Sequence, residues 1–266
     1  MTNGIKINSL NSYIDHIRED RKSWDGASIA WFRGEPNGDT PLLPKVMRPR
    51  ENGSLFDENK LLQMFRMKAP SFTQEKTPEV TQTDQWLFLA QHVGLPTRLL
   101  DWTESALIAL YFAIKNNKEP IVWMISPLRL NALSVSNNER KRIIYRQVFP
   151  LTWFNPKNDK NLGIENIKGA WENNYAGIEL PIAVIPTYIH PRMSAQRSVF
   201  TVHGSIRKPI NEMLKDKGMG DNLLRRYEIK PSIVQDLKKD LNILGIQEST
   251  AFPDLDGLSR ELSDLN

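Results

Sequence analysis

The sequence is organised around Gln91-His-Val-Gly-Leu-Pro-Thr-Arg-Leu-Leu-Asp-Trp-Thr103, which runs directly into the segment Glu104-Ser-Ala-Leu-Ile-Ala-Leu-Tyr-Phe-Ala113. The first part gathers polar side chains around one glycine and one proline, and the second part is almost wholly apolar. Polar groups beside a segment that must be buried have to be satisfied by one another, by a helix end or by a ligand. This stretch is therefore either the structural centre of the fold or the wall of a site.

The apolar segment Ala106–Ile114 predicts a central buried helix, because it is hydrophobic nearly all round. Asp101 and Thr103 stand where the N-terminus of such a helix needs oxygen acceptors, and Asp101-x-x-Glu104 resembles a capping box. We therefore expect one of these two residues to cap the helix. The free N–H groups and the positive dipole end at the same helix start would also suit a pyrophosphate.

Composition limits the class of protein. The 266 residues are 40% hydrophobic and 25% charged, which is typical of a globular domain, and the net charge of +4 favours anionic partners without requiring them. There is no cysteine, so disulfides, thiolate zinc sites and cysteine nucleophiles are excluded. No apolar run approaches the roughly 20 residues of a membrane span, and the N-terminus lacks the apolar core of a signal peptide. We therefore expect a cytoplasmic protein with no membrane contact.

Hydrophobic periodicity outlines the remaining elements. It predicts helices over residues 6–20, 55–69, 85–93 and 232–244, the last capped by Ser232 and ended by Gly245. Runs of β-branched and aromatic residues predict strands over residues 27–32, 120–125, 182–185, 198–202 and 223–229. Because these elements lack a regular βαβ order, we expect an α+β fold with a mixed sheet and a buried central helix.

The domain organisation follows from the same survey. We expect one domain over residues 1–266, with an irregular insertion at about 127–180. The insertion contains the basic run Arg140-Lys-Arg-Ile-Ile-Tyr-Arg146, which is either a solvated face or a contact for phosphates.

Arg33 and Gly34 are the first candidate residues for a functional site, because they follow an apolar strand. A guanidinium there cannot lose its proton and needs a carboxylate or phosphate partner, and glycine leaves room for a ligand to approach the backbone. The alternative is a buried ion pair between Arg33 and Asp101 or a neighbouring glutamate.

Other candidates have a structural alternative as well. His92 lies on a predicted helix and is either a base or a satisfied core or capping group. Thr97 and Arg98 follow Pro96, where the chain is forced to be extended. Asp254 and Asp256 are more typical of a capped turn than of a cation site. We expect no metal site, since the histidines lack metal-binding spacing, and the chain has no Walker, GxGxxG or GxSxG motif.

Several of these motifs together resemble the FRG domain family, which is named for a Phe/Tyr-Arg-Gly motif. The matching blocks are Trp31-Phe-Arg-Gly-Glu35, Leu42-Leu-Pro44 with Arg48, Ala90–Thr103, Ala109–Ala113, Ala195–His203, and Leu244–Ile246 with Phe252–Gly257. One position departs from the pattern, because Val93 stands where the family commonly has an aromatic residue. The resemblance implies a bacterial or phage setting beside defence or toxin genes.

A weaker similarity links the chain to ADP-ribosyltransferases of the arginine–serine–glutamate type, and it implies NAD as substrate. Such an enzyme holds the phosphates with an arginine and stabilises an oxocarbenium-like cation with a carboxylate. The similarity implies that cofactor binding involves Arg33, Gly34, Thr97, Arg98 and Asp101. It implies that catalysis involves Arg33, His92, Thr103, Gln196 and Glu248. Gln196 or Glu248 would take the place of the late glutamate, although Gln196 has no charge to offer.

Together, the two resemblances imply an NAD-using, ADP-ribosyltransferase-like effector in anti-phage defence or a toxin–antitoxin system. Its acceptor would be a protein or a nucleic acid, and an antitoxin or phage-derived protein would be its partner. The alternative is a non-catalytic binding module that recognises a phage protein or nucleic acid through the same pocket.

Overall fold

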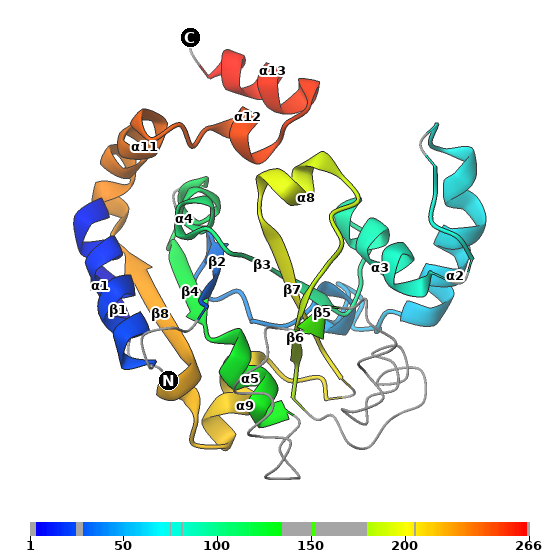
Figure 1. Ribbon diagram of the computed structural model, residues 1–266, viewed down its shortest axis with the longest axis horizontal. Coiled ribbons are helices and arrows are strands. Elements are labelled where there is room, and N and C mark those ends of the chain that lie inside the picture. The colour runs from blue at the N-terminus through cyan, green and yellow to red at the C-terminus, as the bar shows by residue number, and fades with distance from the viewer. Residues whose placement is uncertain are drawn as a thin grey trace.

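The structure is a computed structural model (Figure 1). It describes the chain except residues 1–3, 25–28, 75, 81, 117, 135–150, 153–179, 205 and 265–266. The described strands form one eight-stranded mixed sheet in the order β1-β8-β4-β2-β3-β7-β6-β5. The strands are β1 (Ile5–Ile7), β2 (Trp31–Glu35), β3 (Leu99–Thr103), β4 (Ile121–Ile125), β5 (Leu151–Thr152), β6 (Ile182–Ile185), β7 (Ser198–Val202) and β8 (Leu224–Ile229). Pairing is parallel only for β1 with β8 and β5 with β6, so the α+β expectation is confirmed.

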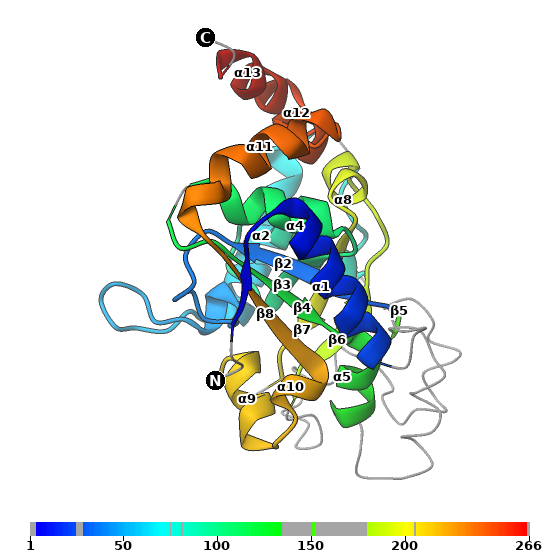
Figure 2. The same ribbon diagram turned by 90° about the vertical axis from the view of Figure 1, so that its left-hand side faces the viewer.

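Helices cover one face of the sheet along its whole width. Figure 2 shows α1 in front of the strands, with α12 and α13 at the end of the molecule away from α9 and α10. The helices over this face are α1 (Leu10–Ser23), α4 (Ala106–Ile114) and α11 (Val234–Ile243) on one half, and α2 (Glu58–Lys68), α3 (Thr83–His92) and α8 (Pro191–Ala195) on the other. The short turns η2 (Ala69–Ser71) and η4 (Pro231–Ile233) flank α2 and α11, and α12 (Glu248–Ala251) and α13 (Leu255–Ser263) follow α11.

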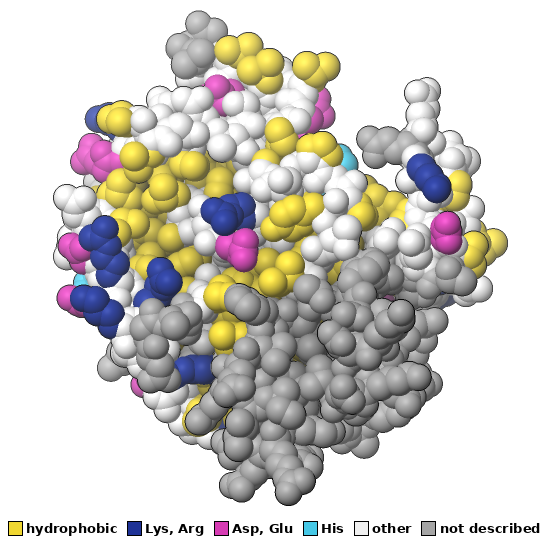
Figure 3. All heavy atoms as spheres, in the orientation of Figure 1, with side chains coloured by type: hydrophobic (Ala, Val, Ile, Leu, Met, Phe, Trp, Pro, Cys, Tyr) yellow, Lys and Arg dark blue, Asp and Glu magenta, His cyan; other side chains and the backbone are white. Residues whose placement is uncertain are grey.

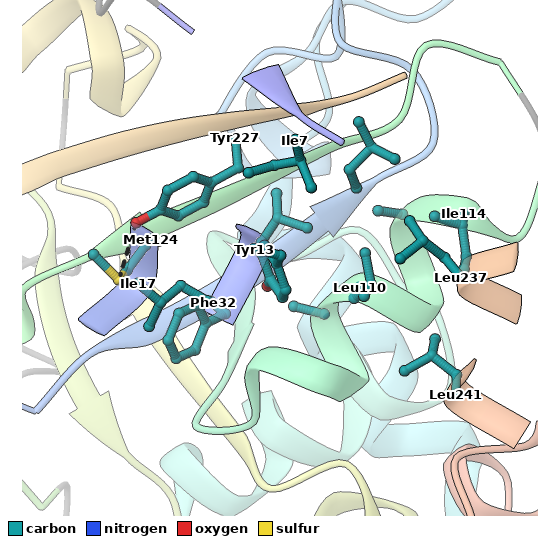
Figure 4. Close-up of a cluster of buried hydrophobic side chains, with 14 of the residues drawn as sticks. Ile7, Tyr13, Ile17, Phe32, Leu110, Ile114, Met124, Tyr227, Leu237 and Leu241 are labelled. Carbon is teal, nitrogen blue, oxygen red and sulfur yellow. Dashed lines mark hydrogen bonds between the residues drawn. The ribbon is translucent and has the colours of Figure 1, made fainter. Parts of the chain in front are cut away.

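Two apolar clusters fill the space beneath these helices. In the first, Tyr13 of α1 meets Tyr227 of β8 edge-on at 5.8 Å, and the fully buried Leu110 of α4 packs over the same strands (Figure 4). In the second, Phe88 of α3 stacks on Phe200 of β7 at 5.3 Å. The expected central helix is therefore confirmed as α4, whose residues are all buried or partly buried and which packs closely against β2.

The opposite face of the sheet is closed by shorter helices, α5 (Pro127–Ser134), α9 (Ile210–Asp216) and α10 (Gly220–Leu223). They pack on Trp31, Leu100, Trp102 and Trp123 of the central strands. Adjacent strand residues point to opposite faces, so β4 is buried on both faces, and β2 and β3 are buried on both faces except at Arg33, Gly34 and Asp101. α5 is regular at the start of the range expected to be irregular, and the basic run Arg140–Arg146 lies outside the described residues.

The expectation that Asp101 or Thr103 caps the central helix is wrong. Both belong to β3, and Ser105 is the N-cap of α4, where its side chain accepts from Ile108 N at 3.3 Å. Pairing with β7 along the whole of β3 extends the chain through Thr103, because all five residues of β3 are in register with β7.

Other boundaries differ by a few residues. α1 begins at Leu10 behind a Ser9 cap, because the preceding residues pair as β1. β2 extends to Glu35, so Arg33 lies inside the strand. Ser232 lies in the 3₁₀ turn η4 and does not cap α11, whereas Gly245 ends that helix region with φ 75° as expected. Among the described residues, no helix is long and apolar enough to cross a membrane.

Candidate functional site

The centre of the sheet is split between β2 and β3. These strands share a single register pair among the described residues, Phe32 with Thr103, whereas β2 makes five pairs with β4. Beyond that pair, Nη1 of Arg33 donates to the backbone carbonyl of Asp101 at 2.7 Å. The guanidinium therefore takes the place of a ladder bond where the two strands diverge.

A chain of polar side chains runs along this split. Arg33 Nε donates to Glu35 Oε1 at 2.6 Å, and its Nη1 lies 3.7 Å from Asp101 Oδ2. Gln91 Nε2 donates to Asp101 Oδ2 at 2.7 Å, and Gln91 Oε1 accepts from Thr97 Oγ1 at 2.6 Å. We call these five residues the polar chain. They satisfy one another beside the buried helix, and the predicted ion pair of Arg33 is made chiefly with Glu35, whose side chain is 7% exposed.

Gly34 is required by the fold. A Cβ atom at this position would lie 1.9 Å from the carbonyl oxygen of Ala109 and 2.6 Å from the amide nitrogen of Ala113, both in the α4 backbone. The room that glycine leaves is therefore occupied by α4, which packs closely on β2. The sequence interpretation had assigned that room to a ligand.

A cavity of about 370 Å³ lies over the split, on the face of the sheet that α3, α4 and α8 cover. Its lining comes from β2, β3 and β7, from the C-terminal ends of α3 and α4, from α8, and from Phe252 after α12. The end of α4 contributes Phe112, Lys115 and Asn116, and none of its first residues takes part. The expected pyrophosphate seat at the start of this helix therefore does not open into the cavity.

The rim of the cavity is cationic and its wall holds a carboxylate. Lys115 Nζ lies 3.0 Å from Glu248 and Arg192 Nη2 lies 3.0 Å from Asp254, yet their side chains remain 38% and 28% exposed. Both cations also lie over the ring of Phe252, at 4.8 and 4.7 Å from its centroid. Asp101 is 55% exposed, and it keeps carboxylate surface free despite its bond to Gln91.

His92 ends α3 and separates this cavity from a neighbouring groove. Its ring lies 3.9 Å from that of His190, tilted by 38°, and His190 Nδ1 accepts from the amide of Arg192. Burial, with the nearby His190 and Arg192, lowers the pKa of His92 to about 4, so the ring is neutral at pH 7. In the part of the chain that the structure describes, no group of three metal-ligating side chains comes together.

The neighbouring groove is larger and mostly apolar, with a volume of about 860 Å³ between α2 and α3. Figure 3 shows the molecule hollowed here, with hydrophobic side chains along the notch. Of the candidate residues, only His92 lines this groove, so the cavity over the split is the better candidate site.

Thr103 and Gln196 are linked at the edge of the cavity. Thr103 Oγ1 donates to the carbonyl of Gln196 at 2.6 Å, and Gln196 Nε2 donates to the carbonyl of Ala251 at 2.9 Å. Glu248 lies behind the rim, where it accepts from Tyr111 and Lys115 and does not line the cavity. Between the two candidates for the late glutamate, the structure brings only Gln196 into the cavity wall.

Arg98 and Thr97 lie outside the cavity. Arg98 forms an ion pair with Glu58 of α2 at 2.6 Å, and Thr97 is 1% exposed within the polar chain. The structure thus brings together six of the candidate residues at the cavity, namely Arg33, Gly34, His92, Asp101, Thr103 and Gln196.

Sequence reasoning missed several cavity residues. Gln91 was available in the opening motif as an amide that can bridge two partners. Lys115 follows the apolar helix directly, and its position at the helix end was a usable signal. Arg192 and Phe252 reach the cavity only because α8 packs on β7 and the segment after α12 packs on α4, which no local pattern reveals.

The fold and the cavity define an α+β protein with a small-molecule-sized polar site at a split in its sheet. The model of the FRG domain matches residues 28–120, the span from the segment before β2 to the start of β4. The chain therefore carries an FRG domain, and the resemblance read from the motifs is confirmed over this span. No curated protein and no solved structure was found that matches the chain.

Proposed function

We propose that the cavity binds NAD as substrate and that the protein is an ADP-ribosyltransferase-like enzyme. One observation carries the proposal: an exposed carboxylate, Asp101, and two partly exposed cations, Lys115 and Arg192, line the same cavity of about 370 Å³. A dinucleotide needs cations for its phosphates, and departure of nicotinamide needs a negative charge beside the ribose.

Asp101 is the carboxylate that we assign to the ribose. The bond between C1′ and the nicotinamide nitrogen breaks, and its electron pair leaves with nicotinamide. An acceptor nucleophile or water supplies the electron pair of the new bond and loses its proton to Asp101. Gln91 donates to the carboxylate of Asp101 and Arg33 donates to its backbone carbonyl, so the orientation of Asp101 is fixed before substrate binds.

Lys115 and Arg192 are the residues that we assign to the phosphates. They stand at the rim, and both lie over the ring of Phe252, which also meets Phe112 edge-on at 5.9 Å. These two rings offer apolar faces to a nicotinamide. The neutral ring of His92 is available as a hydrogen-bonding group and adds no positive charge near the developing cation.

Calorimetry with NAD and measurement of released nicotinamide test the proposal. We expect Asp101→Asn to bind NAD within about threefold of wild type but to release nicotinamide at least about a hundredfold more slowly, as for loss of one transition-state group. Lys115→Met should weaken NAD binding about tenfold or more, as expected for a charge-assisted contact. Glu104→Gln and Lys118→Met are matched controls, because neither side chain lines the cavity.

Failure of wild-type protein to bind NAD would overturn the proposal and favour the non-catalytic binding module. The biological setting that we propose is a toxin-type or anti-phage effector. Induced expression of wild-type protein should then arrest bacterial growth, and expression of Asp101→Asn at equal level should not. Equal growth arrest by both proteins would contradict an NAD-dependent toxic activity.

A further inference from the structure

A second hollow shares a wall with the candidate site. This hollow of about 930 Å³, which we call the basic hollow, is lined by Arg33, Gln91 and Asp101 of the polar chain, as is the cavity. The rest of its lining comes largely from the segment that follows the 3₁₀ turn η1 (Lys45–Met47) and from the loop after α3. A ligand bound here would lie against the residues that orient Asp101.

The basic hollow carries positive charge that the protein does not neutralise. Lys45, Arg48 and Arg50 line it, and within the described ranges none of the three forms an ion pair. The carboxylates in its lining are Glu51 and the already bonded Asp101. Three unpaired cations in one concave surface indicate an anionic ligand.

Arg48 is held in place without a carboxylate. Its guanidinium donates to the carbonyls of Leu43 at 2.8 Å and Pro41 at 3.1 Å, and the residue is half-buried. Burial and the positive charge of Arg33 lower the pKa of Arg48, against the opposing effect of Glu35. Two guanidinium groups that line one hollow repel each other, and an anion between or beside them relieves the repulsion.

The cations stand on a packed segment. Val46 and Met47 are buried in a small apolar cluster with Leu43 and Phe56, and the Arg50 guanidinium lies 4.3 Å from the centroid of the Phe56 ring. The hollow therefore combines fixed cations with an aromatic side chain, the combination that binds single-stranded nucleic acids through backbone and base.

We propose that the basic hollow binds the phosphodiester backbone of a single-stranded nucleic acid and directs one of its nucleotides to the cavity as the acceptor. The acceptor role rests on the proposed NAD-dependent function, whereas the binding role does not. Lys45, Arg48 and Arg50 contact phosphates, and a base packs against the exposed part of the Phe56 ring, next to the Arg50 guanidinium.

A single strand fits the hollow better than a duplex. An enzyme that acts on a base inside a cavity must receive it unpaired and unstacked, and a single strand meets this condition without the energy of base flipping. The wall shared by the two hollows is formed by Arg33, Gln91 and Asp101, which can hydrogen-bond a base edge.

Binding is tested by fluorescence anisotropy with a short mixed-sequence oligonucleotide, as single-stranded DNA, as RNA and as duplex. The test variant is Lys45→Ala with Arg50→Ala, because both side chains are exposed. The control is Lys230→Ala with Lys239→Ala, which removes two exposed cations outside both hollows. We expect the test variant to weaken single-strand binding about tenfold near 0.1 M salt and to reduce the slope of log affinity against log salt by about 1.4.

Equal single-strand affinity of the test and control variants would overturn the proposal. It would also be overturned if duplex bound as tightly as the single strand, or if poly-glutamate competed as well as the oligonucleotide, which would favour an acidic peptide. Comparison of the single-stranded DNA with the RNA shows which of the two nucleic acids the basic hollow binds.

The acceptor role is tested with NAD labelled in its adenylate part. The test variant should release nicotinamide to water at the wild-type rate but should transfer at most about a tenth as much label to the oligonucleotide. Equal transfer by both variants would overturn the acceptor role. If no variant releases nicotinamide, the NAD proposal has failed, and the anisotropy measurements still decide the binding role.

Discussion

Arg33 holds Glu35 at 2.6 Å with Nε and the backbone carbonyl of Asp101 at 2.7 Å with Nη1, so one side chain joins two strands where their ladder ends. The planar fork of a guanidinium can make both contacts at fixed angles, and an ammonium group cannot. The same contact orients Asp101, which lines both the cavity and the basic hollow. Fold and site therefore depend on one residue.

Arg33→Ala should lower the free energy of unfolding by about 3 to 5 kcal/mol, because it leaves the buried carboxylate of Glu35 unpaired. The double variant Arg33→Leu with Glu35→Leu should recover most of this loss, since it removes the buried charge as well. Urea unfolding measures both. Arg18→Ala is the control. Its ion pair with Asp15 is exposed, so its loss should change the free energy of unfolding by less than about 1 kcal/mol. A double variant as unstable as Arg33→Ala would contradict this account.

The Arg33 contacts also show what the sequence could and could not predict. An arginine at the end of an apolar strand requires an anionic partner, and a neighbouring glutamate is one of the two protein partners that the sequence offers. The split between β2 and β3 was not predictable, because it depends on how two strands far apart in the chain diverge in the sheet. Asp101 was misassigned as a cap for a related reason, because pairing with β7 outweighs the local capping pattern.

Gly34→Ala should destabilise the protein by about 4 kcal/mol or more, because its methyl group would overlap the α4 backbone. Backbone atoms of a buried helix cannot move aside as a flexible side chain can. Thermal unfolding measures the effect, with loss of soluble protein as its extreme form. Gly220→Ala is the matched control, since nothing lies within 4 Å of the added atom, and it should be neutral or slightly stabilising. A Gly34→Ala protein as stable as wild type would contradict this packing role and would favour a role of Gly34 in ligand binding.

His203 makes stability depend on pH. Its side chain is 1% exposed, and neither ring nitrogen has a hydrogen-bond partner among the described residues. Burial and the nearby Arg98 lower its pKa from 6.5 to about 3. Between these pH values the unfolded chain binds a proton that the folded protein does not, so stability falls as pH falls.

From pH 7 to pH 5 this histidine alone should cost about 2 kcal/mol. His203→Leu should therefore lose about 2 kcal/mol less than wild type over the same interval, as urea unfolding at the two pH values would show. An identical pH dependence in the two proteins would show that the ring is protonated or solvated in the folded state.

Phe252 should control how firmly the C-terminal helices are held. Its ring is approached by three cations from different elements, at 4.7 Å for Arg192, 4.8 Å for Lys115 and 5.2 Å for Arg260. α13 itself adds little apolar burial, because Leu255 is 83% exposed. Through Lys115 and Arg192, the Phe252 ring therefore links the C-terminal segment α12–α13 to the rest of the protein.

Phe252→Leu keeps an apolar side chain but removes the ring face, and each cation contact is worth about 0.5 to 1 kcal/mol at exposed sites. We expect hydrogen exchange to accelerate about tenfold or more in α12 and α13, while protection of β2, β4 and α4 stays at the wild-type level, because the loss is local. Phe72→Leu is the control, since that ring is 84% exposed and should change neither region. Equal acceleration in the sheet would mean that Phe252 supports the whole fold, and no acceleration would mean that the salt bridges of Glu248 and Asp254 suffice to hold the segment.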